Sequence, residues 1–389
     1  MAPNLAMEEL SRYRDSIILD PMAGSGTVLK HASVAGNQAI GLDMDPLAVM
    51  MSQVFNTGYD LNEVAMILKK ILNRINDFTD QEVELPWIDG DAETLKFIKF
   101  WFGPRQELEI RRIIKAINDI QLENQAQHLP SYFDLMRIAL SRIIVTKENG
   151  ASLARDVSHS RPHKVTHWSV YDVTAGFQKS LSNISKLLEQ NGAHGLVKVS
   201  RGDARNMTTI ENRSIDLVFT SPPYLNAIDY MRGHKLALVW LGYTCSELRK
   251  IRSSTIGAER GPESKEEVDT FEKICDEMLS GYVVDPRTQQ MITRYAGDSY
   301  RLMSEISRTL KSDGKAVLVV GDSCLKGVFI KNSGCFIKAA EMVGMRLSKR
   351  AEREIPANRR YLPMPARDGS QLAARMRSEV VLTFEFPAI

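Results

Sequence analysis

The sequence contains few cysteines and no long apolar run. Only four cysteines occur among 389 residues, and they form no C-x-x-C pair and have no histidine partner at zinc-finger spacing. We therefore expect reduced thiols, without a disulfide framework or a metal site. No basic leader precedes an apolar stretch, and no apolar run reaches the roughly 18 residues of a membrane span. These absences predict a cytoplasmic protein with no membrane partner.

The chain also has little net charge, but its charges are unevenly distributed. The formal net charge is +2 at pH 7. Residues 346–377 hold nine Lys and Arg against three Asp and Glu, whereas residues 263–285 hold eight acidic residues against two lysines. A basic segment is more often a solvated surface than a binding site, so the charge pattern permits a nucleic-acid partner without requiring one.

One β-α-β unit is visible near the start of the chain. Residues 17–19 form a short buried-type strand, Gly24 and Gly26 form a tight turn, and residues 28–34 are helical. Gly36 and Asn37 end that helix, and residues 38–42 form a second strand. Such units build parallel sheets whose ligands lie outside the carboxyl ends of the strands.

The rest of the chain divides into a helical stretch and a continuation of the sheet. Apolar residues at three- and four-residue spacing predict that residues 55–195 are a mainly helical insertion between core segments 1–54 and 196–389. Further strands are predicted at 195–204, 215–220, 315–322 and 379–386. The fold class is therefore α/β and Rossmann-like, with a mostly parallel sheet of about seven strands and helices on both faces. Residues 255–290 are polar enough to predict a mobile excursion.

The glycine turn excludes two common phosphate-binding motifs. G-x-G-x-x-G would need glycine at Leu29, and the G-K-[ST] of a P-loop is contradicted by Thr27, which directly follows Gly26. The two glycines still allow the backbone to approach a ligand closely. The N–H groups at the start of the next helix favour a carboxylate on that ligand.

Aspartates follow the next two strands where an adenosine would need acceptors. Asp43 ends the second strand and is placed to accept from ribose hydroxyls, and Asp203 ends the third and is placed to accept from an adenine amino group. A ligand with a carboxylate, a ribose and an adenine but no phosphate is S-adenosylmethionine. Each aspartate alone is more often a cap or loop residue, but their order along the chain favours this cofactor.

The apolar run at 215–220 stops abruptly at Ser221-Pro222-Pro223-Tyr224. Two consecutive prolines remove two backbone donors and make a rigid strand end. In such a sheet this strand lies on the other side of the first strand, so the tetrapeptide faces the methyl donor. The Ser221 hydroxyl and the Pro222 carbonyl are placed to accept from an exocyclic amino group and free its lone pair, while Tyr224 stacks on the base. No cysteine adjoins the prolines, which disfavours covalent attack on cytosine C5.

These motifs resemble those of a known family. D-P-M-A-G-S-G-T is similar to the D-P-F-x-G-x-G-T motif, and T-S-P-P-Y to the [D/N/S]-P-P-[Y/F] motif, of S-adenosylmethionine-dependent DNA amino-methyltransferases. The serine variant is similar to the cytosine-N4 members. The resemblance implies a class I methyltransferase fold, S-adenosylmethionine as cofactor and double-stranded DNA as partner, with the target base flipped out of the duplex. Two features depart from the family: the glycine motif precedes the proline motif, and the insertion precedes the third strand.

The resemblance also assigns site residues. The catalytic residues it implies are Ser221, Pro222, Pro223 and Tyr224. The cofactor-binding residues it implies are Asp20, Pro21, Met22, Ala23, Gly24, Ser25, Gly26, Thr27, Asp43, Met44, Asp203 and Ala204. Candidates for nucleic-acid contacts, taken from the basic segments, are Arg155, Arg161, Lys164, Arg232, Lys235, Arg359 and Arg360.

Several functions are consistent with these residues. The preferred hypothesis is methylation of cytosine N4 in DNA, followed by methylation of adenine N6. Methylation of structured RNA at guanine N2 is an alternative because related proline motifs serve such enzymes. A non-catalytic DNA-binding protein on the same fold is the least favoured alternative, since every strand end carries the required group.

Overall fold

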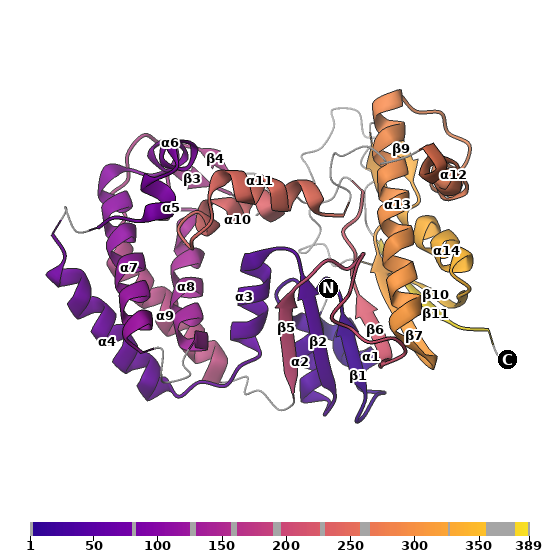
Figure 1. The fold of residues 1–389 in the computed structure, drawn as a ribbon, viewed down its shortest axis with the longest axis horizontal. Helices are drawn as coiled ribbons and strands as arrows, with labels where there is room; N and C mark the ends of the chain where they lie inside the picture. The colour runs from indigo at the N-terminus through magenta and orange to yellow at the C-terminus, as the bar shows by residue number, and fades with distance from the viewer. Residues whose placement is uncertain are drawn as a thin grey trace. The chain divides into compact units, whose positions relative to one another are not determined.

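The chain folds into two compact units. The computed structural model describes residues 3–79, 83–124, 130–156, 162–189, 196–225, 230–256, 265–325, 327–354 and 378–387. Residues 1–44, 194–228 and 253–389 form the first unit, called the α/β unit, and residues 45–193 and 229–252 form the second, called the helical unit. Figure 1 follows the chain through both.

A seven-stranded sheet is the centre of the described part of the α/β unit. Its order is β10-β11-β7-β6-β1-β2-β5. The strands are β1 (Ile17–Asp20), β2 (Gln38–Asp43), β5 (Val197–Arg201), β6 (Ile215–Thr220), β7 (Leu310–Val320), β10 (Arg346–Glu354) and β11 (Ser378–Glu385). All neighbouring pairs are parallel except those of β11, which runs antiparallel to both β7 and β10.

This strand order confirms the predicted Rossmann-like fold of class I methyltransferases. Strand β1 lies between β2 and β6, so the chain reverses direction across the sheet at β1, which is the switch point expected from the sequence. The strand that ends at the proline motif is therefore a direct neighbour of the strand that ends at the glycine loop.

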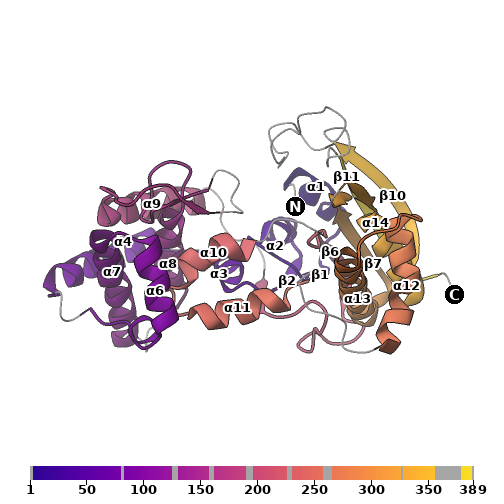
Figure 2. The same ribbon diagram turned by 90° about the horizontal axis from the view of Figure 1, so that it is seen from above.

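Helices cover both faces of the sheet because strand side chains alternate between the faces. Ile18 and Phe219 point into a cluster with helices α1 and α2, whereas Leu19 and Val218 point into a cluster with α13 and α14. Each such fully buried side chain stabilises the fold by about 1.5–3 kcal/mol relative to an exposed one. The helices of this unit, several of which are visible in Figure 2, are α1 (Pro3–Leu10), α2 (Thr27–Val34), α12 (Lys265–Leu279), α13 (Pro286–Thr309) and α14 (Asn332–Met342). A small hairpin of β8 (Ser323–Leu325) and β9 (Val328–Ile330) follows β7.

Part of the polar stretch at 255–290 is helical, contrary to the prediction of an excursion. Helix α12 buries Phe271, Ile274 and Met278, which recur at helical spacing, while Glu272, Lys273, Asp276 and Glu277 are exposed. Asp285 caps α13 by accepting from the Thr288 N–H at 3.1 Å. Because this stretch is rich in acidic residues, its amphipathic helical pattern was not recognised in the sequence.

Part of the basic segment at 346–377 is the edge strand β10, which the sequence did not predict. None of its residues is fully buried, and all but Leu347 and Ala351 are polar. Arg346 pairs with Glu385 of β11 at 2.9 Å and Arg353 with Glu379 at 3.8 Å. Charged side chains on an edge strand discourage pairing with a second chain, which accounts for the missing hydrophobic signal.

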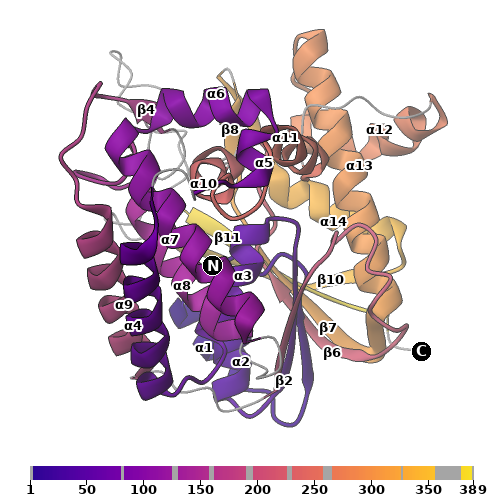
Figure 3. The ribbon, with the colours of Figure 1, turned by 60° about the vertical axis from the view of Figure 1, so that its left-hand side comes forward.

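The helical unit begins ten residues earlier than the predicted insertion and also includes residues 229–252. Figure 3 shows α4, α7, α8 and α9 side by side. Helix α4 buries Val64, Ile67, Ile71 and Ile75 along one face. The elements of this unit are α3 (Pro46–Phe55), α4 (Leu61–Asp77), α5 (Pro86–Asp89), α6 (Ala92–Trp101), α7 (Pro104–Glu123), α8 (Pro130–Ile144), β3 (Ala154–Arg155), β4 (His163–Lys164), α9 (Val173–Glu189), α10 (Tyr230–Leu238) and α11 (Cys245–Ser254).

Residues 229–252, which hold α10, most of α11 and the turn between them, belong to the helical unit because their apolar side chains complete its core. Leu238, Trp240 and Leu248 are at most 2% exposed and contact the core built by α4 to α9. The Trp87 indole also donates to the Val239 carbonyl at 2.9 Å. None of the described helices combines the length and apolarity needed to cross a membrane.

Candidate cofactor and catalytic site

Hydrogen bonds tie together the carboxyl ends of the four parallel strands that carry the predicted site. Thr220, at the end of β6, donates to Asp20 of β1 at 2.7 Å. The Gly24 N–H donates to the Asp43 carboxylate of β2 at 2.8 Å, and the Gly202 N–H, just after β5, donates to the Asp43 carbonyl at 3.0 Å. The structure therefore brings the four predicted strand ends to one edge of the sheet.

The glycine loop adopts a conformation that requires glycine. Gly24 has φ of 53° and Gly26 has φ of 82°, both in the left-handed region that side chains other than glycine rarely occupy. Gly26 is the N-cap of α2, and no side chain caps the first turn of that helix. The first N–H groups of α2 are thus of the kind that bind an anion such as a carboxylate.

The predicted loop residues fall into two groups by exposure. Pro21, Ala23 and Gly26 are buried and shape the loop, whereas Ser25 is exposed. Met22, Gly24 and Thr27 are partly exposed, so a ligand can reach the loop at these positions and at Ser25.

Asp20 is a buried carboxyl that organises the loop. It is 3% exposed and accepts from the Met22 N–H at 3.2 Å as well as from the Thr220 hydroxyl. Burial raises the pKa of Asp20 to about 7, although the Thr220 and Met22 hydrogen bonds act in the opposite direction. These contacts hold the end of β1 and the start of the loop in place.

Replacing Asp20 by asparagine is expected to make stability less sensitive to pH. Because the folded pKa lies above the ordinary value, the folded state binds this proton more tightly than the unfolded chain. The stabilisation is complete below pH about 4 and is lost as pH rises through about 7, amounting to up to about 4 kcal/mol for three pKa units. Urea unfolding of wild type and Asp20→Asn at pH 5, 6, 7 and 8 measures it. We expect the variant to gain stability relative to wild type as pH rises, and parallel pH profiles would contradict the assignment.

Asp43 and Met44 lie at the end of β2, where the ribose contact was predicted. Asp43 is half-buried and lies at the edge of the sheet where the parallel strands end. Its Oδ2 accepts from the Gly24 N–H, so this carboxylate also holds the glycine loop in place. Met44 is also half-buried, with its Sδ 4.0 Å from the Arg205 guanidinium.

Asp203 forms an ion pair that the sequence did not reveal. Arg205 donates through Nε to Oδ1 at 2.9 Å and through Nη2 to Oδ2 at 2.8 Å of Asp203, and through Nη1 to Asp298 of α13 at 2.6 Å. Burial by itself lowers the pKa of Arg205, but the bonds to Asp203 and the charge of Asp298 produce a net rise. A carboxylate has about four acceptor positions, so Asp203 keeps capacity for a further donor. Ala204 beside it is buried.

The serine of the proline motif is held with its proton directed into the protein. The Ser221 hydroxyl donates to the Val319 carbonyl of β7 at 3.0 Å. Because the hydroxyl hydrogen is used there, the oxygen presents only lone pairs to a ligand. Pro222 is buried, and no described residue donates to its carbonyl.

Tyr295 supports the proline motif from α13. Its hydroxyl donates to the Pro223 carbonyl at 3.0 Å, and its buried ring packs edge-on against Phe336. Pro223 itself is exposed, and Tyr224 is partly exposed and packs against the core of this unit. Tyr295 lies 72 residues from Pro223 in sequence, so no local pattern pointed to it.

The described candidates for nucleic-acid contacts all lie in the helical unit. Arg155 donates to the Ala154 carbonyl at 2.7 Å and to Asn149 at 3.2 Å, so its guanidinium braces its own loop. Lys164 lies 4.7 Å from the ring of Phe100 and Lys235 lies 4.5 Å from the ring of Phe97, both on α6. Arg232 is exposed on α10. The remaining candidates, Arg161, Arg359 and Arg360, lie outside the described residues.

Comparison with curated proteins points to one group. The chain is 24% identical over 277 residues to the Type II methyltransferase M.BsoBI of Geobacillus stearothermophilus, covering 67% of this chain and 53% of that protein. It is 22% identical over 361 residues to the Type II methyltransferase M.MjaII of Methanocaldococcus jannaschii, covering 72% and 66%. The Type II methyltransferase M.AvaI of Nostoc sp. is 26% identical over 259 residues, covering 61% and 51%.

The chain is similar in sequence to type II methyltransferases. It spans less than two thirds of the length of each of these relatives. No protein-family model matches it.

Solved structures give only weak matches. A TehB-like SAM-dependent methyltransferase from Corynebacterium glutamicum matches with a TM-score of 0.32 and 10% identity, over 100% of this chain and 89% of that one. A putative sarcosine dimethylglycine methyltransferase from Galdieria sulphuraria matches with a TM-score of 0.35 and 8% identity, over 98% and 84%. The fold is therefore established by the strand order described above.

Proposed function

We propose that the chain transfers a methyl group from S-adenosylmethionine to the exocyclic amino group of a base in DNA, with cytosine N4 as the preferred target. The observation that carries the proposal is the pairing of two motifs on neighbouring strands. The glycine loop follows β1 and Ser221-Pro222-Pro223-Tyr224 follows β6, and the Thr220–Asp20 hydrogen bond joins the two strand ends. The sequence similarity to type II methyltransferases supports the same reaction class.

The residues at this edge fit the proposed cofactor. The first turn of α2 and the glycine loop provide N–H donors for its carboxylate, while Asp43 and Asp203 provide acceptors for its ribose hydroxyls and adenine amino group. The cofactor supplies an electrophilic methyl group. The Gly24 N–H holds Asp43, and the Arg205 guanidinium holds Asp203. The positions of both carboxylates are therefore fixed before the cofactor binds.

The proline motif supplies two acceptors for the two hydrogens of an amino group. Ser221 Oγ offers its lone pairs because its own hydrogen is donated to Val319, and the Pro222 carbonyl is the second acceptor. An amino nitrogen whose hydrogens are held in this way localises its lone pair and becomes a better nucleophile. After the nitrogen gains the methyl group it loses one proton, which passes to water because neither acceptor is basic enough to keep it.

The target base must leave the duplex to reach these acceptors. Tyr224, which is partly exposed beside them, provides an aromatic face on which the flipped base stacks. The same two acceptors would serve adenine N6, and Ser221 favours cytosine only through the similarity of the motif to cytosine-N4 members of the family.

A product assay tests the proposal. The protein is incubated with methyl-labelled S-adenosylmethionine and double-stranded DNA or structured RNA, and the nucleic acid is digested to nucleosides. We expect label in N4-methylcytosine, and Ser221→Ala should lower its rate of formation at unchanged cofactor affinity because one acceptor is lost.

Other products would revise the proposal in defined ways. N6-methyladenine would keep the reaction class and change the base. Label confined to RNA would overturn the DNA assignment. Binding of DNA without binding of the cofactor would support a non-catalytic role.

A further inference from the structure

Two lysines of the helical unit are held by aromatic rings instead of carboxylates. Lys164 of β4 has its Nζ 4.7 Å from the centre of the Phe100 ring, and Lys235 of α10 has its Nζ 4.5 Å from the centre of the Phe97 ring. Both lysines are partly exposed, and no ion pair joins either of them to a described residue. An aromatic face attracts an ammonium group without cancelling its charge. Each lysine is therefore positioned and still able to bind an anion.

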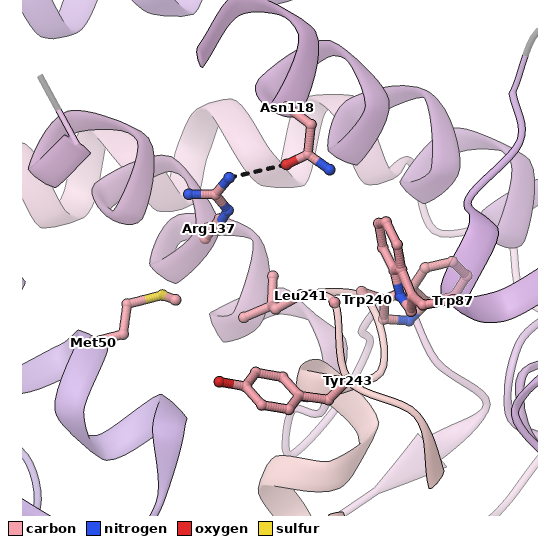
Figure 4. Close-up of a pocket in the computed structure, with 8 residues that line it drawn as sticks. Met50, Trp87, Asn118, Arg137, Trp240, Leu241 and Tyr243 are labelled. Carbon is pink, nitrogen blue, oxygen red and sulfur yellow. Dashed lines mark hydrogen bonds between the residues drawn. The ribbon is translucent and has the colours of Figure 1, made fainter. Parts of the chain in front are cut away.

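Several other cations of this unit have their charge compensated by internal acceptors. Arg137, which lines the cavity of about 220 Å³ in Figure 4, donates to Asp134 at 3.0 Å and to Asn118 at 2.9 Å. Arg111 donates to both oxygens of Asp89, at 2.9 and 2.8 Å. These guanidinium groups act within the fold, which distinguishes them from the two lysines.

The rings beneath the two lysines form one continuous cluster on α6. Phe97 and Phe100 are three residues apart, a spacing that places them side by side on a helix. The Trp101 ring contacts both, with ring centres 6.1 Å from Phe97 and 5.0 Å from Phe100. Phe100 is 52% exposed, and Lys96, one turn before it, is also exposed. This surface, called the α6 face, consists of Lys96, Phe97, Phe100, Trp101, Lys164 and Lys235.

The acidic residues at the start of α6 already have partners. Asp91 caps the helix by accepting from the Thr94 N–H at 2.7 Å, so its charge lies at the positive end of the helix dipole. Glu93 forms an ion pair with Arg249. The α6 face therefore carries an excess of positive charge, which suits a polyanionic partner.

A hydrogen-bonded turn presents a further aromatic ring close to Lys164. The Val165 N–H donates to the Leu153 carbonyl at 3.1 Å, and the Thr166 hydroxyl donates to the Trp168 carbonyl at 2.9 Å. Trp168 is 69% exposed. Because it follows Lys164 by four residues, the two Cα atoms are at most ~14 Å apart. Figure 3 shows β4, which contains Lys164, next to α6.

We propose that the α6 face binds the sugar–phosphate backbone of DNA, with Lys164 and Lys235 as phosphate contacts. Trp168 stacks on an unpaired base of the bound strand. Positioned cations beside exposed aromatic rings match the two components of a nucleic acid, its phosphates and its bases. Such contacts provide affinity and register without reading the sequence. The choice of DNA among polyanions rests on the proposed function.

The salt dependence of DNA binding by the full chain tests this surface. Binding of a fluorescently labelled duplex is measured by anisotropy at several salt concentrations, with S-adenosylhomocysteine present. In the double variant Lys164→Met/Lys235→Met, methionine keeps an apolar side chain over each ring and removes the charge. We expect the slope of log K against log salt to become about 1.8 less steep, because each phosphate contact contributes about 0.9. With equal affinities at about 1 M salt, this is a loss of about 60-fold at about 0.1 M.

Matched variants separate charge from structure. Lys164→Arg/Lys235→Arg keeps both charges and their contacts with the rings, so it should bind DNA within a few-fold of wild type. Lys70→Met removes an exposed lysine of α4, outside the α6 face, and should leave the salt slope unchanged. Thermal unfolding of each variant establishes that it is folded.

The stacking contact is tested with single-stranded DNA. Trp168→Ala should weaken its binding about five- to 150-fold, since stacking of a base on an aromatic ring contributes about 1–3 kcal/mol. Stability should not change, because the ring is mostly exposed. Unchanged affinity of this variant for single strands contradicts the stacking role.

Two outcomes would overturn the proposal. One is an equal salt slope and equal DNA affinity in wild type and the double methionine variant. The other is unchanged DNA binding together with lost binding of polyglutamate in that variant, which would make the α6 face a site for an acidic protein. Methyl transfer is measured separately. Lysine-dependent DNA binding without methyl transfer contradicts the proposed function alone, and DNA methylation with equal affinities in both proteins contradicts this inference alone.

Discussion

Replacement of Tyr224 by alanine is expected to lower methyl transfer to DNA by about five- to 150-fold. Stacking of a base on an aromatic ring contributes about 1–3 kcal/mol, and alanine removes the ring that Tyr224 presents beside Ser221. Poorer positioning of the amino group adds to the loss. Single-turnover rates at saturating cofactor and DNA measure the effect directly.

Tyr224→Phe is the matched control for this prediction. It keeps the aromatic face and removes only the hydroxyl, so its rate should stay within a few-fold of wild type. Cofactor affinity should be unchanged in both variants. Equal activity of the alanine variant and wild type would contradict the stacking role, and equal losses in both variants would assign the effect to the hydroxyl.

Replacement of Arg205 by methionine is expected to have the largest effect on stability. Arg205 is 17% exposed and holds both Asp203 and Asp298, and it also donates to the Ser254 carbonyl. Methionine keeps much of the side-chain length but leaves two neighbouring carboxylates without their shared cation. Breaking a buried ion pair costs about 3–5 kcal/mol, and the 33% exposure of Asp203 places this case at about 2–4 kcal/mol.

Guanidinium unfolding with Arg301→Met as control measures this effect. Arg301 lies 3.9 Å from the same Asp298 but is 38% exposed, so its loss should cost less than about 1 kcal/mol. Cofactor affinity should fall in the Arg205 variant, because Asp203 is then no longer held. Equal stability of the two variants would contradict the central role of Arg205.

The sheet was predictable because its strands lie in an interior that demands apolar residues. Strands β1, β2 and β6 carry short apolar runs that end in the polar residues Asp20, Asp43 and Thr220, and their bounds agree with the predicted ones to within one residue. Strand β10 was missed because an edge strand needs no apolar face. Residues 229–252 were included in the core segment 196–389, because sequence position alone does not show against which partner a segment packs.

The sequence points to candidate site residues where they belong to a local motif or follow a predicted strand, as Asp43 and Asp203 do. The glycine loop and the proline motif are local features whose backbone geometry restricts residue type, so they are visible in one chain. Arg205, Tyr295 and Thr220 act through partners that lie two, 72 and 200 residues away. The Arg205–Asp203 pair was close enough to be noticed, but two residues of opposite charge at that spacing are too common to indicate an ion pair.

The division of the chain into units has a consequence for any attempt to produce them separately. The helical unit is encoded by two stretches, 45–193 and 229–252, so a fragment covering 55–195 alone lacks Trp240 and Leu238 and would expose the core they fill. The polypeptide crosses between the units four times. One crossing directly follows Asp43 and Met44, and another comes four residues after Tyr224. The backbone of the proposed site is therefore itself part of the covalent joint between the two units.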